Sequence, residues 1–61
     1  MPWSADDYPP AMNRLPDEVR LKAIEIANAL LAEGYDEGRA IRIAIAAAKR
    51  WARRRWGAPY L

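Results

Sequence analysis

The 61-residue chain contains no cysteine and no histidine. Without cysteine it can form no disulfide and offers no thiolate to a metal ion or a redox reaction. Histidine most often shuttles protons near neutral pH, and together with cysteine it supplies most ligands of zinc and catalytic metals. The two side chains that most often serve in catalytic and metal sites are therefore absent. We expect a protein that is not an enzyme and that holds no metal ion or cofactor.

Long apolar runs and a secretory leader are also missing. The least polar stretch, residues 40–48, is interrupted by Arg42. It has about half of the roughly 20 residues that a membrane span needs. The first residues, MPWSADDYPP, lack the basic and apolar regions of a signal peptide. We expect no integral membrane segment and a cytoplasmic location.

Carboxylates are missing from the last part of the chain. Eight acidic and three basic residues give the segment through Glu37 a net charge of −5, and the seven basic residues after it give +7. Such an asymmetry is typical of a chain with an anionic partner.

A chain this short forms one domain, residues 1–61, whose core rarely contributes more than a few kcal/mol. We therefore expect a protein partner or a homodimer to add stability.

Residues 1–15 hold three of the five prolines and predict an arm, with one short helical turn after Ser4 and another around residues 10–13. Large apolar side chains are expected to pin the arm onto the helices: Trp3, Tyr8, Met12 and Leu15.

Two helices should follow the arm, giving an all-α fold. Pro16 and Asp17 suit the start of a first helix over residues 16–33, and Gly34 suits its end. Its apolar spacing predicts a buried face of Val19, Ala23, Ile26, Ala27, Leu30 and Leu31, widened by Ile24. The turn is short, so the second helix should run back antiparallel as a helical hairpin.

The second helix should span residues 37–56, with Asp36 as its N-cap and Gly57 and Pro59 as its stop. Its period predicts a buried face of Ile41, Ala44, Ile45, Ala48, Trp51 and Ala52. The alanines would let the two axes approach, and Trp51 would fill the wider end of the interface. The opposite side gathers Arg39, Arg42, Lys49, Arg50, Arg53 and Arg54.

Several short motifs resemble the ChaB family of small bacterial proteins. They are the opening MPW, Asp-Tyr-Pro at positions 7–9, Leu-Pro at 15–16, the pair Glu25 and Asn28, and AIAAAK at 44–49. Trp3, Ala27 and Ile45 replace the family's usual Tyr, Phe and Trp. The chain is more similar still to the N-terminal segment of uncharacterised YdaT-type bacterial proteins. The resemblance implies a small helical module and a description as a regulator of cation transport, without an established activity.

The acidic pairs at positions 6–7, 17–18 and 36–37 are candidate cation ligands. Each pair is expected where a helix or helical turn begins, and the unpaired N–H groups there attract carboxylates without any further function. We therefore interpret them as helix-start residues.

The basic side of the second helix supplies the candidate anion- or nucleic-acid-binding residues: Arg39, Arg42, Lys49, Arg50, Arg53, Arg54 and, at its edge, Trp56. A competing hypothesis leaves these residues as a solvated face or pairs them within the hairpin, with Asp17 and Glu18 opposite Arg53 and Arg54, and with Glu25 near Arg42 or Lys49. A DNA-reading helix-turn-helix and a membrane-surface helix fit less well, because Glu37 would face phosphates and the apolar face is needed for the core. The function we expect is a non-catalytic protein-interaction or regulatory module, with nucleic-acid binding as the alternative.

Overall fold

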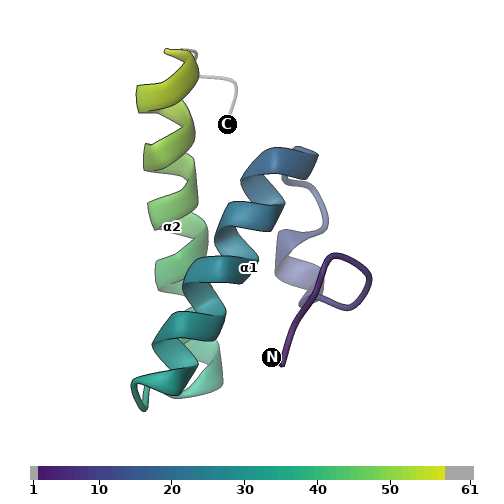
Figure 1. Ribbon diagram of the computed structural model, residues 1–61, viewed down its shortest axis with the longest axis vertical. Coiled ribbons are helices and arrows are strands. Elements are labelled where there is room, and N and C mark those ends of the chain that lie inside the picture. The colour runs from purple at the N-terminus through teal and green to yellow at the C-terminus, as the bar shows by residue number, and fades with distance from the viewer. Residues whose placement is uncertain (1, 58–61) are drawn as a thin grey trace.

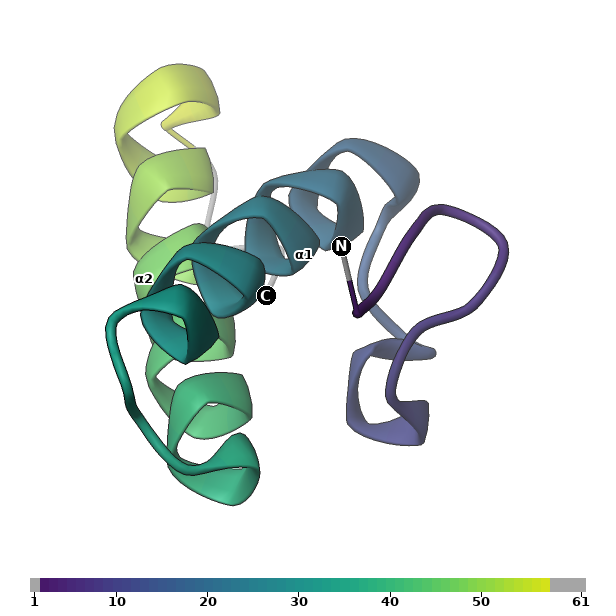
Figure 2. The same ribbon diagram turned by 60° about the horizontal axis from the view of Figure 1, so that its bottom comes forward.

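The computed structural model describes residues 2–57, and the described chain is all-helical as predicted (Figure 1). A short 3-10 helix, η1 (Pro10–Met12), precedes the two long helices, α1 (Asp17–Ala32) and α2 (Glu37–Trp56). Helices α1 and α2 run antiparallel and lie closest near their connecting turn, and they diverge toward the opposite ends in both views (Figures 1 and 2). Helix α1 lies between α2 and the arm, so it is buried on two sides.

Helix α1 begins after Pro16 and ends in a complete Schellman turn. Gly34 has a φ of 103°, a left-handed conformation that glycine adopts without a Cβ penalty. The Gly34 N–H donates to the Leu31 carbonyl at 3.0 Å, and the Tyr35 N–H donates to the Leu30 carbonyl at 3.1 Å. These two bonds satisfy carbonyls that the end of the helix would leave unpaired. They fix the tight reversal that sends α2 back along α1.

Helix α2 begins at the predicted cap. The Asp36 carboxylate accepts a hydrogen bond from the Arg39 N–H at 3.2 Å. At the other end Gly57 has a φ of 69°, and its N–H donates to the Arg53 carbonyl at 2.7 Å. The predicted stop at Gly57 is therefore confirmed, whereas Pro59 lies outside the described residues.

The face of α2 that packs on α1 is narrower than the sequence predicted. Its fully buried residues are the alanines at every fourth position: Ala40, Ala44, Ala48 and Ala52. Ala40 had not been assigned to this face, and the larger residues Ile41, Ile45 and Trp51 are half-buried at its borders. Small side chains let the axes approach along one line, so bulky neighbours are displaced to the flanks.

The arm packs against α1 as expected. Met12 and Leu15 join the buried cluster of both helices, and Trp3 and Tyr8 pack against it. Arg20 of α1 fastens the arm further, because its guanidinium donates to the Leu15 carbonyl at 2.8 Å and lies 4.8 Å from the centre of the Tyr8 ring. On α1 the buried set includes Ile24, which had been expected only to widen the stripe, whereas Ile26, Leu30 and Leu31 are half-buried.

One local prediction in the arm is wrong. Instead of a helical turn, residues 4–7 form a tight reversal in which Ser4 and Asp7 exchange two backbone hydrogen bonds, of 2.9 and 3.1 Å. The chain therefore doubles back before it reaches the two prolines. The second expected turn is confirmed as η1, which begins at Pro10 because the first helical position needs no N–H donor.

Candidate functional site

The outward side of α2 carries the residues that we call the basic face: Arg39, Arg42, Lys49, Arg50, Arg53 and Arg54. All are exposed except Lys49, which is half-buried. They lie opposite the buried alanine row, with the exposed Ala46 among them. At 1.5 Å per residue the face extends for about 22 Å along the helix. The structure thus places six sequence-predicted site residues on one continuous surface.

No carboxylate of α1 forms an ion pair with this surface. Within residues 2–57 both ion pairs lie inside α1, between Arg20 and Asp17 at 2.6 Å and between Lys22 and Glu25 at 3.0 Å. The hypothesis of pairing across the hairpin is therefore wrong for this structure. The two helices diverge at the end where α1 begins and α2 ends (Figure 1). The buried alanine row faces α1, so the basic face on the opposite side of α2 points away from it.

Two tryptophans form the border of the basic face at the end of α2. The rings of Trp51 and Trp56 meet edge to face, with their centres 5.3 Å apart and an angle of 85° between their planes. The Arg55 guanidinium lies 5.6 and 5.7 Å from the two ring centres. Arg55 is thus placed at the tryptophan pair, while Trp56 keeps 39% of its surface exposed.

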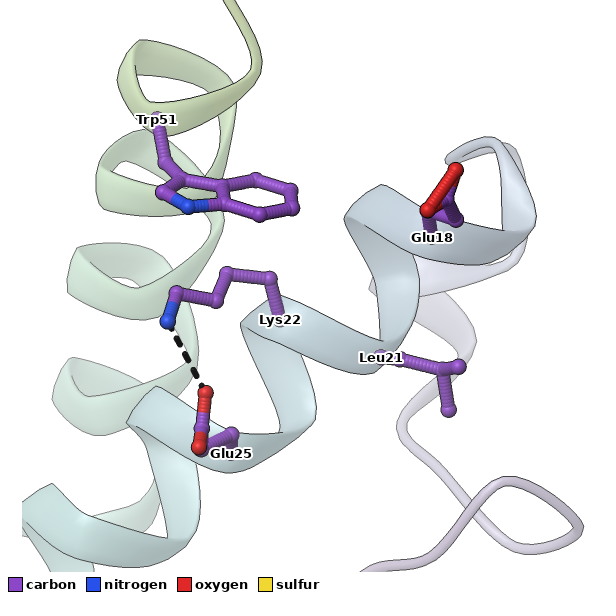
Figure 3. Close-up of a pocket in the computed structure, with 5 residues that line it drawn as sticks. All are labelled: Glu18, Leu21, Lys22, Glu25 and Trp51. Carbon is purple, nitrogen blue, oxygen red and sulfur yellow. Dashed lines mark hydrogen bonds and ion pairs between the residues drawn. The ribbon is translucent and has the colours of Figure 1, made fainter. Parts of the chain in front are cut away.

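A hollow opens between the diverging helices, lined by Glu18, Leu21, Lys22, Glu25 and Trp51 (Figure 3). The Trp51 ring projects from α2 toward α1, and the Lys22 ammonium lies 5.4 Å from its centre while it binds Glu25. Trp51 thus packs against the buried cluster and is covered in part by the long Lys22 side chain, and it is half-buried.

The acidic pairs are distributed as follows. Asp17 and Glu18 occupy the first turn of α1, and Asp36 caps α2, as predicted. The pair Asp6 and Asp7 lies in the reversal of the arm instead of at a helical turn. Between residues 2 and 57 no three carboxylates come together as a group that could hold a metal ion. In the same part of the chain, neither helix has the length and apolar composition that crossing a bilayer requires.

One buried polar residue was not predicted from composition or periodicity. Asn28 is 5% exposed, and its side chain pairs with the backbone of Trp3. A polar residue on the apolar side of a helix was the available signal, because such a group needs a partner when it is buried. Its role in this structure is to hold the arm.

The comparisons with known proteins give one relative. A protein of Bacillus subtilis (strain 168) named "Uncharacterized protein YdaT" is 60% identical over 52 residues, which are 85% of this chain and 35% of that protein. The chain therefore spans about a third of the length of the curated relative it matches. No family model and no solved structure matches the chain. The likeness to YdaT-type proteins is confirmed, and the likeness to the ChaB family stays a prediction.

Proposed function

We propose that this chain is a non-catalytic interaction module and that the basic face of α2 is its binding surface for an anionic partner. The observation that carries the proposal is the row of six cationic side chains without a carboxylate partner in residues 2–57. Unneutralised like charges on one surface attract polyanions and release the counterions of the partner.

The distribution of charge supports the same surface. Beyond Glu37 no acidic residue occurs in the sequence, so no carboxylate on α2 itself interrupts the basic face. The resemblance to ChaB-type proteins supports a regulatory role for such binding but names no partner. The homodimer and the cytoplasmic location stay predictions.

Heparin, used as a generic polyanion, tests the proposal. The wild-type chain should be retained on a heparin column at about 50 mM salt, because charge-driven binding is strongest at low ionic strength. The triple variant R50Q/R53Q/R54Q should elute at clearly lower salt. Arg50→Gln alone should have a smaller effect in the same direction.

Arg14→Gln is the matched control, because Arg14 is an exposed cation in the arm and lies off the basic face. It removes the same charge as Arg50→Gln. If R14Q and R50Q weaken retention equally, net charge and not the basic face is responsible. If the wild-type chain passes through the column unretained, the proposed function is wrong.

A further inference from the structure

We propose that the anionic partner is a single-stranded nucleic acid, whose phosphates lie along the basic face while one base stacks on Trp56. This inference rests on the proposed function of the basic face. It also gives a role to Trp56, because a surface that binds polyanions by charge alone would not need an aromatic ring at its border.

The first observation is the register of α2. Lys49, Arg53 and Trp56 follow one another at spacings of four and three residues, so they form one line along the helix surface. This line is about 10 Å long at the helical rise of 1.5 Å per residue. A bound strand can therefore touch cations and an aromatic ring at the same time, the combination that single-strand-binding surfaces use.

The second observation is the fixed orientation of the ring. Trp56 is held edge to face by Trp51, and Arg55 lies against both rings. Trp51 is in turn held against α1 by Lys22. An aromatic side chain that is already oriented loses little conformational freedom when a base stacks on it. Trp56 as a whole residue keeps 39% of its surface exposed.

The third observation is the charge on the two sides of Trp56. Toward α1, a hollow of about 480 Å³ is lined by Pro16, Asp17, Glu18, Val19 and Trp56 itself. Carboxylates on that side repel phosphates, whereas Lys49 and Arg53 attract them on the other side. A strand would therefore direct its backbone along α2 and a base toward the hollow.

The side chains of the basic face favour a single strand over a duplex. In a duplex groove the arginines of the basic face can read guanine edges, but the face contains no Asn, Gln, Ser or Thr to read the other bases. An aromatic ring gains contact only with a base that is unstacked from its neighbours. We therefore expect binding with little dependence on base sequence.

The test compares oligothymidylate of about 12 nucleotides, within the range of single-strand site sizes, with an abasic sugar-phosphate strand of equal length. Both carry the same phosphates, and only the first has bases. By fluorescence anisotropy at about 50 mM salt, the wild-type chain should bind oligothymidylate about fivefold to 150-fold more tightly, the range that stacking of one base supplies. Binding should also quench tryptophan fluorescence.

Trp56→Ala should remove this preference and leave affinity for the abasic strand and for heparin unchanged. Tyr35→Ala is the matched control, because Tyr35 is also 39% exposed and lies beside Arg39 at the other end of α2. Only Arg39 of the basic face lies near Tyr35, whereas Lys49, Arg50, Arg53 and Arg54 gather near Trp56. Y35A should therefore keep the preference for oligothymidylate.

The outcomes separate this inference from the proposed function. Equal affinity of the wild-type chain for both strands overturns the inference and leaves the basic face as a general polyanion surface. This comparison needs no variant, so it stands even if W56A fails to fold. Tighter binding to duplex DNA or to polyglutamate than to oligothymidylate also overturns it. Failure to bind heparin and both strands overturns the proposed function as well.

Discussion

The side chain of Asn28 pairs with both polar backbone groups of Trp3. The Trp3 N–H donates to Oδ1 of Asn28 at 3.2 Å, and Nδ2 of Asn28 donates to the Trp3 carbonyl at 3.0 Å. The two residues are 25 positions apart, and Asn28 is 5% exposed. The amide thus offers the arm the donor and acceptor that a neighbouring strand would offer, and it fixes the arm on α1.

Truncation of this amide should destabilise the chain more than its size suggests. Asn28→Ala leaves the N–H and carbonyl of Trp3 without their partner, which costs about 1–3 kcal/mol of unfolding free energy. Such a loss is large for a domain of this length. Urea unfolding followed by circular dichroism measures it. The exposed Asn13 provides the control, since N13A should change stability by less than about 0.5 kcal/mol.

Asn28→Asp tests whether donation to the Trp3 carbonyl matters. An ionised carboxylate accepts from the N–H but cannot donate, so N28D should be destabilised at neutral pH. A protonated carboxyl can donate, and burial favours the protonated form. The loss should therefore shrink as the pH falls toward about 4, the ordinary range of an aspartate. A loss that does not change with pH would show that the second hydrogen bond contributes nothing.

The sequence predicted the elements better than their contacts. Caps and glycines are local signals, so Asp36, Gly34 and Gly57 located the ends of the helices. The buried face of α2 depends on where α1 lies. The helical period alone predicted that Ile41 and Ile45 would be as buried as the alanines, whereas they are half-buried. The closest approach of two helices selects the smallest residues, which a single helix does not reveal.

Ala48 should tolerate no larger side chain, because it is fully buried between the two helices. Ala48→Leu should cost about 1–3 kcal/mol by forcing the axes apart. Ala46→Leu makes the same change at an exposed position of the same helix and should stay within about 0.5 kcal/mol of the parent. The midpoints of urea unfolding compare the two. Equal midpoints would mean that the alanine row does not form the interface.

The cap of α2 should contribute measurably to stability. Asp36→Ala removes the carboxylate that accepts from the Arg39 N–H, and loss of such a cap costs about 1 kcal/mol. The helix content at moderate temperature should fall in parallel. Asp6→Ala deletes an exposed carboxylate of the arm and should leave the thermal midpoint unchanged. A D36A variant as stable as D6A would show that the turn holds the helix start without the cap.

The pairing of charges was the less predictable part of the candidate site. The antiparallel arrangement predicted that Asp17 would lie opposite Arg53. The distance between them depends on how far the helices diverge at that end, and the divergence cannot be read from the order of charges in the sequence. Asp17 instead binds Arg20, a neighbour within its own helix. Residues three positions apart lie next to each other on any α-helix, so a pair of this kind can form wherever its segment is helical. Apart from Arg39, which follows Asp36 by three positions, the cations of α2 have no acidic residue three or four positions away, and none of them forms an ion pair within residues 2–57.

This arrangement predicts that the basic face lowers the stability of α2. Arg50 has Arg53 and Arg54 three and four positions ahead of it, and like charges at these spacings each destabilise a helix by a few tenths of a kcal/mol. Arg50→Glu turns both repulsions into attractions in the favourable order, acid before base. Position 50 also precedes the last turn of α2, where the helix dipole would penalise an acid.

R50E should therefore raise the unfolding free energy by about 0.5–1 kcal/mol at low salt while it weakens retention on heparin. The gain should shrink at about 500 mM salt, where exposed charges are screened. Arg14→Glu carries the same charge change in the arm and should raise stability little. A stabilised but poorly binding R50E fits a surface kept for a partner at some cost in stability. A destabilised R50E would mean that Arg50 supports the fold and that the basic face is structural.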